Sequence, residues 1–270
     1  MNKYLSGEKL YGDDFSQEQI QQWYNDELEG YADLGSKDFS NYSYKYHEVN
    51  KVHAFNKIRR KQFDNVLGFG SAWGHEFEPI IEKISHLTIV EPSENLRSKT
   101  IGSIIPEYVT PTVTGKLDLD NNSFDLITCF SALHHVPNVS FVVKELIRVL
   151  KPDGYLLIRE PIVSMGDWNR PRKGLTKNER GIPVTFFDAL FDNDKSVQVV
   201  SKEYFFTLST FFQRRFGKFF KKPIYAYKSY IMFDKFLSSL LRFNTKYYTK
   251  NGLHKIAPSC IFYVIKKMPA

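Results

Sequence analysis

The chain contains little cysteine, no long apolar run and almost no acidic residues in positions 201–270. Its two cysteines, Cys129 and Cys260, lie inside apolar segments, so we expect buried, reduced thiols and no disulfide framework. No apolar run reaches the roughly 18 residues that a membrane span needs, and the polar N-terminal segment does not resemble a signal peptide. These absences favour a globular protein of the cytoplasm.

Charge is distributed unevenly along the 270 residues. Residues 201–270 hold 14 Lys or Arg and only two acids, Glu203 and Asp234, although the whole chain has a net charge of only +7. Such a basic segment indicates an anionic partner or a solvated basic surface. No nucleic-acid-binding motif accompanies it, so we expect no nucleic-acid partner.

Strand and helix patterns alternate through the middle of the chain. We expect strands at 64–69, 86–90, 108–114, 124–130, 155–160, 196–205 and 258–265. Helices are expected at 14–34, 75–84, 93–102, 138–150, 207–220 and 228–243, with a short one ending near 61. This alternation predicts an α/β, Rossmann-like fold: a seven-stranded, mostly parallel sheet with helices on both faces and an antiparallel last strand.

The chain divides into four predicted parts. Residues 1–62 form an N-terminal helical lid, and residues 63–203 form the core of the sheet. Residues 204–257 are an inserted aromatic and basic helical cap, and residues 258–270 return as the last core strand.

A glycine turn follows the first predicted strand. Residues 65–74, NVLGFGSAWG, let the backbone approach a nucleotide-like ligand closely. Glu91 ends the second strand, where a carboxylate can accept hydrogen bonds from both ribose hydroxyls. A nicotinamide cofactor would satisfy both features, but it leaves the segments that follow the fourth strand unexplained.

Four segments in this order resemble the class I S-adenosylmethionine-dependent methyltransferases over residues 60–162: VLGFGSAWG, IVEPS, NNSFDLITCFSALHHV and RVLKPDGYLLIREP. The resemblance implies S-adenosylmethionine as the cofactor and methyl transfer to a small molecule, lipid, quinone or sugar. The cofactor-binding positions it suggests are Gly68, Phe69, Gly70, Ser71, Gly74, Glu91, Pro92, Leu117, Asp118 and Phe130.

The chain departs from this family at two positions of the turn and at one near the adenine. An acid is usual where Gly68 stands, a glycine where Ala72 stands, and a further acid near Thr112, for which Asp118 can substitute. We expect the segment 44–55 to compensate at the methionine end or to bind substrate. Its polar residues at helical spacing are Tyr46, His47, Asn50 and His53, although the same pattern suits a helix packed on the sheet edge.

His134 and His135 follow the fourth strand and are candidate general bases, since histidine titrates near neutral pH. Glu160 is a second candidate base, and its structural alternative is a salt bridge with Arg159 or another local cation. In the polar segment 166–183, Arg170 and Arg172 either grip an anionic group or belong to a solvated loop. We predict no metal site.

Methyl transfer to the hydroxyl of a sugar or another small anionic acceptor is the predicted activity. A nucleotide- or lipid-linked glycan would place the protein in polysaccharide biosynthesis. The alternatives are C-methylation of a quinone or lipid, and a non-catalytic cofactor-binding protein. The aromatic and basic segment 204–222 fits a lid over the acceptor, a contact with the inner membrane surface, or a homodimer face.

Overall fold

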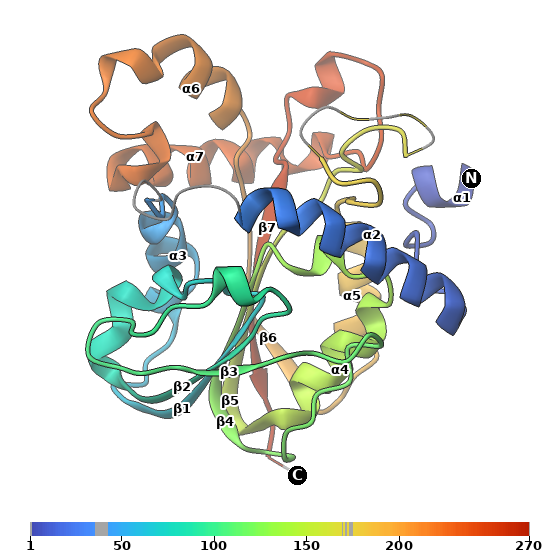
Figure 1. Ribbon diagram of the computed structural model, residues 1–270. Helices are drawn as coiled ribbons and strands as arrows, with labels where there is room; N and C mark the ends of the chain where they lie inside the picture. The colour runs from blue at the N-terminus through green and yellow to red at the C-terminus, as the bar shows by residue number, and fades with distance from the viewer. Residues whose placement is uncertain (1, 36–42, 169, 171, 173–174, 270) are drawn as a thin grey trace.

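The computed structural model describes residues 2–35, 43–168, 170, 172 and 175–269. Its centre is a seven-stranded sheet with the order β3-β2-β1-β4-β5-β7-β6 (Figure 1). The strands are β1 (Phe63–Phe69), β2 (Ile84–Val90), β3 (Glu107–Val109), β4 (Phe124–Phe130), β5 (Leu150–Pro161), β6 (Val197–Phe205) and β7 (Cys260–Lys267).

Pairing directions follow the predicted scheme. β1 pairs in parallel with β2 and β4, and β4 pairs in parallel with β5. β7 runs antiparallel between β5 and β6. All seven residues of β4 are buried, as its unbroken apolar run predicts for a central strand covered on both faces. The Rossmann-like prediction is therefore confirmed.

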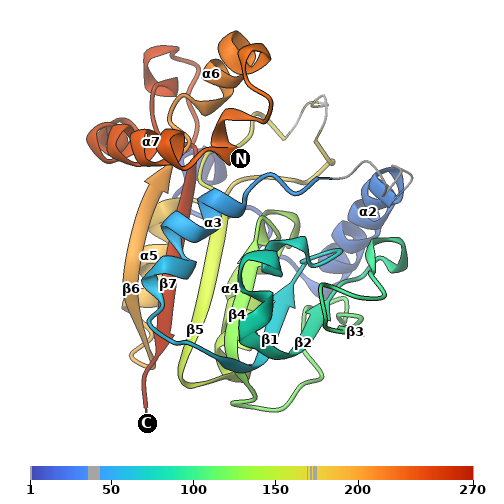
Figure 2. The ribbon, with the colours of Figure 1, turned by 90° about the vertical axis from the view of Figure 1, so that its left-hand side faces the viewer.

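Helices cover both faces of the sheet (Figure 2). The α-helices are α1 (Asn2–Leu5), α2 (Gln17–Gly35), α3 (His47–His53), α4 (Val139–Val149), α5 (Val184–Asp192), α6 (Ser209–Phe216) and α7 (Lys228–Leu241). One core cluster joins α4 and α5 to the sheet, and a second joins α3, α7 and the 3-10 segment η3 to the opposite face. The 3-10 segments are η2 (Phe55–Lys57), η3 (His75–Lys83), η4 (Glu94–Leu96), η5 (Leu133–His135), η6 (Gly217–Phe219), η7 (Ile224–Ala226), η8 (Arg242–Asn244) and η9 (Leu253–Lys255).

Two predicted helices of the core take other forms. The segment expected at 75–84 is the 3-10 helix η3, which contains Pro79. A proline inside a helix removes a backbone donor and opposes regular α-helix geometry. The helix expected at 93–102 is wrong, because only the single turn η4 forms there. Arg97 instead reaches back to the carbonyl of Glu91 at 3.0 Å and holds this segment as a loop.

The segment between β6 and β7 lies over the carboxyl ends of the parallel strands, beside α3 (Figure 1). Asp234 of α7 fixes it, because this buried carboxylate accepts hydrogen bonds from the amides of Phe206 (2.6 Å) and Thr207 (3.1 Å). α2 crosses above the same edge of the sheet. None of the helices in the described part of the chain is long and apolar enough to cross a membrane.

Candidate functional site

Two cavities meet at the carboxyl edge of the sheet, and Gly70 lines both. The larger has a volume of about 680 Å³ and lies between the glycine turn, the ends of β4 and β5, and the cap. The smaller has a volume of about 90 Å³ and lies beneath Trp23 and Tyr24 of α2. A ligand that crosses Gly70 would therefore occupy both cavities.

The glycine turn needs its glycines at two positions in particular. Gly70 has a φ of +65°, and a Cβ there would lie 2.6 Å from the Cβ of Ala132. Gly74 has a φ of +72°, and its Cβ would meet Ile101. Both residues thus combine left-handed backbone with a close approach that a side chain would block. Ala72, at the usual glycine position, adopts a φ of +46° without being glycine.

Glu91 supports the turn from the end of β2. It is buried, and its carboxylate accepts hydrogen bonds from the amides of Ala72 (3.1 Å) and Ser93 (3.0 Å). Burial raises the pKa of Glu91. Burial and the nearby Glu91 carboxylate also raise the pKa of Tyr24, which places α2 close to this carboxylate. Each carboxylate oxygen can accept a further hydrogen bond. Binding of ribose hydroxyls by Glu91 stays a prediction.

Gly68 stands where an acid was expected, and a carboxylate from another residue, Glu76, is linked to this position through Ser71. A Cβ at Gly68 would lie 2.4 Å from the Oγ of Ser71. That hydroxyl donates to Glu76 Oε1 at 3.0 Å, and Thr128 Oγ1 donates to the same oxygen at 2.5 Å. Glu76 lies in the first turn of η3 and lines the larger cavity. Burial raises its pKa to about 7. Sequence analysis missed Glu76, whose only signal is an acid directly after the turn.

Arg159 is a second residue that sequence analysis did not place in the site. Its buried guanidinium donates to Asn50 Oδ1 (2.8 Å), Tyr44 Oη (3.3 Å) and Ser131 Oγ (3.3 Å). It also lies 4.8 Å from the ring centre of Tyr46, in a cation–π contact at the wall of the larger cavity.

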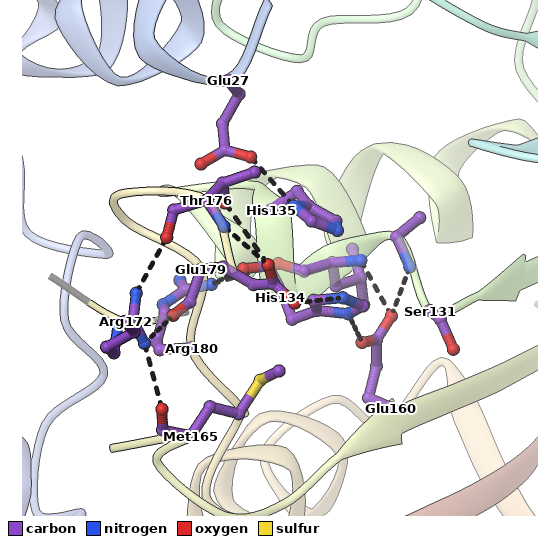
Figure 3. Close-up of polar contacts among 12 residues, drawn as sticks. Glu27, Ser131, His134, His135, Glu160, Met165, Arg172, Thr176, Glu179 and Arg180 are labelled. Atoms are coloured by element: carbon purple, nitrogen blue, oxygen red, sulfur yellow. Dashed lines mark hydrogen bonds and ion pairs between the residues drawn. The ribbon is translucent and has the colours of Figure 1, made fainter. Parts of the chain in front are cut away.

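Glu160 points to the opposite face of the sheet from Arg159, as neighbouring residues of a strand do. The structural alternative of a salt bridge between the two is therefore wrong. Glu160 Oε1 accepts from the amides of Ala132 (2.9 Å) and Leu133 (2.8 Å), and Oε2 contacts His134 Nδ1 at 2.7 Å (Figure 3). This fully buried, hydrogen-bonded carboxylate is not placed to take a proton from an acceptor, which corrects the prediction that Glu160 is itself a base.

His134 is held in one tautomer by that contact. A carboxylate only accepts, so Nδ1 carries the proton and Nε2 carries the lone pair. Burial lowers the pKa of His134, which favours the neutral ring. Its Nε2 lies 3.6 Å from Glu179 Oε1, and the residue lines the larger cavity.

His135 faces the other cavity. Its Nδ1 lies 2.9 Å from Glu27 Oε2 of α2, and the backbone carbonyl of His135 accepts from Trp23 Nε1 at 2.7 Å. The two histidines are adjacent in space, with ring centres 4.2 Å apart, yet only His134 lines the larger cavity while His135 lines the smaller.

The four polar residues at helical spacing in and before α3 do not share one face. Tyr46 lines the larger cavity, and Asn50 reaches it through Arg159. His47 lies 3.1 Å from Glu78 on the outer side of η3, beside a separate cavity. His53 is buried against Phe205 and pairs with Glu203 at 2.9 Å. Neither histidine lines the larger or the smaller cavity, because this seven-residue helix presents them to η3 and to the core, and their predicted ligand contact stays a prediction.

In the basic segment after β5, Arg172 donates hydrogen bonds to backbone carbonyls of the same segment. Arg172 donates to the carbonyls of Met165, Thr176, Lys177 and Glu179 at 2.5–3.3 Å. Arg170 is 84% exposed and lies 3.9 Å from Asp167. Neither arginine lines the two cavities described above, so their binding of an anionic ligand stays a prediction. Arg180 is buried, donates five hydrogen bonds to backbone carbonyls and lies over the ring of Trp23.

The remaining predicted cofactor positions divide between the two cavities. Phe69 and Pro92 line the smaller, and Ser71 and Phe130 line the larger. Leu117 belongs to the core and Asp118 is exposed, and neither lines the smaller cavity, so their contact with the adenine stays a prediction. The wall of the smaller cavity comes instead from the preceding loop: Pro111, Thr112, Val113 and Gly115.

Comparison with known proteins agrees with this architecture. Residues 67–158 match the Methyltransf_11 family, described as a methyltransferase domain. A 90-residue stretch is 30% identical to 2-methyl-6-phytyl-1,4-hydroquinone methyltransferase of Synechocystis, covering 30% of this chain and 24% of that protein. A polyketide synthase of Dictyostelium discoideum is 26% identical over 130 residues, covering 39% of this chain and 5% of its own length. The chain thus spans a quarter or less of these curated relatives.

Two solved structures share the fold at low identity. A Bacillus halodurans protein described as a candidate methyltransferase has a TM-score of 0.53 at 15% identity, over 83% of this chain and 98% of its own. An S-adenosylmethionine-dependent methyltransferase of Mesorhizobium loti has a TM-score of 0.50 at 16% identity, over 78% and 94%. The family match shows a methyltransferase domain over residues 67–158, and the sheet order is the Rossmann-like order shared with these structures.

Proposed function

We propose that this chain is a methyltransferase that binds S-adenosylmethionine across Gly70. The adenosine would lie in the smaller cavity, between Pro92 and the loop 111–115, and the methionine end would reach the larger one. The observation that carries the proposal is the meeting of the two cavities at the glycine turn, with a carboxylate on each side of it. We propose that Glu76, which lines the larger cavity, binds the ammonium group, and that Glu91 at the end of β2 binds the ribose.

Glu76 is the proposed anchor of the cofactor's amino group. Its carboxylate lies under the turn, where Ser71 and Thr128 each donate to Oε1. Those two hydrogen bonds orient the carboxylate, so that in its ionised form, which the nearby Arg159 charge favours, it would offer a negative partner to a cation in the larger cavity. The compensation for Gly68 that sequence analysis assigned to the segment 44–55 is thus proposed for η3 instead.

Methyl transfer needs an acceptor aligned with the sulfonium and, for a hydroxyl, a group that removes its proton. His134 is the proposed base, because its Nδ1 is held by Glu160, its Nε2 retains the lone pair, and the residue lines the larger cavity. Glu160 is a positioning residue that fixes the tautomer and stabilises the ring once it is protonated. His135, which faces the smaller cavity, is proposed to help close α2 over the cofactor.

The larger cavity suggests the class of acceptor. Its cap side is aromatic, with Phe205, Phe206 and Tyr225, and it also contains Arg159 and Arg214. Aromatic faces pack against a sugar or quinone ring, and arginines bind phosphate or carboxylate. We propose O-methylation of a sugar or another small anionic acceptor, such as a nucleotide- or lipid-linked glycan of polysaccharide biosynthesis. C-methylation of a quinone is the second candidate, favoured by the aromatic wall and by the hydroquinone-modifying relative.

A labelled-methyl screen tests this proposal. Purified protein is incubated with methyl-labelled S-adenosylmethionine and with sugar nucleotides, glycolipids or hydroquinones in separate reactions. Transfer to a sugar class supports the first candidate, and transfer to a hydroquinone alone supports the second. No transfer to any class, together with tight cofactor binding, would favour a non-catalytic cofactor-binding protein.

The cap is further proposed to contact an anionic membrane surface at the cytoplasmic face. Exposed aromatic side chains, among them Phe211, Phe219, Phe236 and Phe243, lie on α6, η6, α7 and η8. They are interspersed with basic residues such as Arg215, Lys218, Lys221 and Lys222. Apolar groups beside cations suit the interface of anionic lipid. Flotation with anionic vesicles but not neutral ones would support this contact. Equal binding to both, or a stable dimer that covers the surface, would contradict it.

A further inference from the structure

The cluster around His134 and His135 contains more ligating atoms than a proton-accepting histidine needs. One ligand atom from each of His134, His135 and Glu179 lies within 4.8 Å of the others. These three residues come from η5 and from the loop after β5, and α2 adds Glu27 beside them (Figure 3). The sequence offers little sign of this group, because only the two histidines are adjacent in the chain.

Each of the three residues has one side-chain atom in contact with a neighbouring group. Glu160 contacts His134 Nδ1 at 2.7 Å, and Glu27 contacts His135 Nδ1 at 2.9 Å. Glu179 uses Oε2 to accept from the amide of Thr176 at 3.1 Å, which leaves Oε1 directed toward His134 Nε2. Metal-binding histidines in proteins characteristically have one ring nitrogen on a carboxylate, which orients the other nitrogen toward the ion.

The central distance fits an ion better than it fits a hydrogen bond. His134 Nε2 and Glu179 Oε1 are 3.6 Å apart. A hydrogen bond between nitrogen and oxygen is about 2.7–3.2 Å long. Two ligands of a tetrahedral ion with bonds of about 2.1 Å are about 3.4 Å apart. The pair is therefore spaced as two ligands of one small cation.

A buried carboxylate oxygen next to the cluster also lacks a partner. Glu27 is 4% exposed, and its Oε1 has no hydrogen-bond partner among the described residues. A buried carboxylate oxygen without a hydrogen bond is costly, and a bound cation would satisfy it. Arg172 and Arg180 direct their hydrogen bonds to backbone carbonyls, although their charges interact with the Glu27 carboxylate.

We propose that His134, His135 and Glu179 bind a divalent first-row transition-metal ion of the Zn²⁺ type, with Glu27 and Glu160 as the carboxylates that orient the two histidines. Two imidazoles and one carboxylate are a ligand set that Zn²⁺ accepts, with a fourth position open to water or to an acceptor oxygen. The inference concerns binding and does not depend on methyl transfer. A cation on Nε2 would occupy the lone pair that the proposed base uses, so activity is to be assayed both with chelator and with added Zn²⁺.

Calorimetric titration of tag-free, chelator-treated protein with ZnCl₂ tests the proposal. We expect one ion per chain with micromolar or tighter affinity. Glu179→Gln should weaken the affinity by about tenfold or more, and Glu27→Gln by about 10- to 100-fold, since it removes an orienting carboxylate. The matched control is Glu78→Gln, because Glu78 contacts His47 and His75 on the outer surface. This control should leave the affinity unchanged.

Three results would overturn the inference: no binding by the wild-type protein, equal binding by the Glu179→Gln and wild-type proteins, or loss of binding in the control alone. The last would place the ion at the outer histidines. If Glu179→Gln does not fold, the Glu27→Gln protein decides. Thermal unfolding of the wild-type protein gives a further readout, since an ion at 100 times its Kd stabilises the fold by about 2.7 kcal/mol. No shift at saturating Zn²⁺ would contradict a site inside the fold.

Discussion

Replacement of Glu76 by Gln is the change that most sharply separates the proposed amine anchor from a structural carboxyl. The amide keeps the size of the side chain and can still accept from Ser71 and Thr128, so the fold should persist. It removes the charge that an ammonium group would use. A hydrogen bond to a charged group contributes about 1.5–3 kcal/mol. We therefore expect Glu76→Gln to weaken S-adenosylmethionine binding by about 10- to 150-fold.

The pKa of Glu76 adds a second signature. Burial raises this pKa to about 7, so about one tenth of the protein carries the carboxylate at pH 6 and about nine tenths at pH 8. Only the ionised form is competent to bind the ammonium group, and the apparent Kd varies inversely with the competent fraction. Wild-type affinity should rise about tenfold from pH 6 to pH 8, whereas Glu76→Gln should show a flat profile.

Calorimetry at pH 6, 7 and 8 measures both effects. Glu78→Gln is the matched control, since Glu78 lies two residues along η3 and is half-exposed. That control should bind like the wild-type protein at every pH. If Glu76→Gln keeps the wild-type affinity and the wild-type pH profile, then Glu76 is a structural carboxyl and the amino group binds elsewhere.

The same pKa predicts how the ligand-free protein's stability changes with pH. The folded state keeps the Glu76 proton up to about pH 7, whereas the unfolded chain loses it near the ordinary value of 4.5. The free energy of unfolding should therefore fall as pH rises from about 4.5 to 7, by up to about 3 kcal/mol. Denaturant titrations of the wild-type and Glu76→Gln proteins across this range measure the difference. A wild-type slope identical to that of the variant would refute the shift.

Three other changes test the rest of the site. Glu91→Ala should weaken cofactor binding by about tenfold or more, because the ribose and the turn both lose the carboxylate; unchanged affinity would place the ribose elsewhere. His134→Gln should lower kcat by about 10²–10⁴-fold with cofactor affinity retained, and retained kcat would mean that alignment alone drives transfer. Glu160→Gln should lower kcat and shift the pH–rate profile, because the tautomer of His134 is no longer fixed; a merely structural role would leave the profile in place.

Much of the fold follows from the sequence because it depends on local apolar runs. β4 is apolar at nearly every position and is buried throughout, and β5 pairs with it in parallel as predicted. Ser16 also begins α2 as a helix cap should, with Gln19 reaching back to its amide at 3.0 Å. Where apolar periodicity is weak, as at 93–102, side-chain contacts decide the form and the prediction failed.

The site was less predictable because its partners are distant in the chain. Glu27, His135 and Glu179 meet only once α2 and the loop after β5 have folded over η5. The helical spacing of residues 46–53 indicated a shared face, but the short helix α3 divides its side chains between the cavity, η3 and the core. Arginines in a basic loop suggested an anion site, yet backbone carbonyls satisfy Arg172, and a one-dimensional pattern does not contain that information.

The position of the cofactor's amino group tests the central claim most directly. A crystal structure of the complex with S-adenosylhomocysteine measures it, together with the place of the adenine. The account predicts the amino nitrogen at about 3 Å from a carboxylate oxygen of Glu76, and the adenine in the smaller cavity beside Pro92. An amino group held by Tyr44 or Asn50 instead, or an adenine outside that cavity, would contradict it.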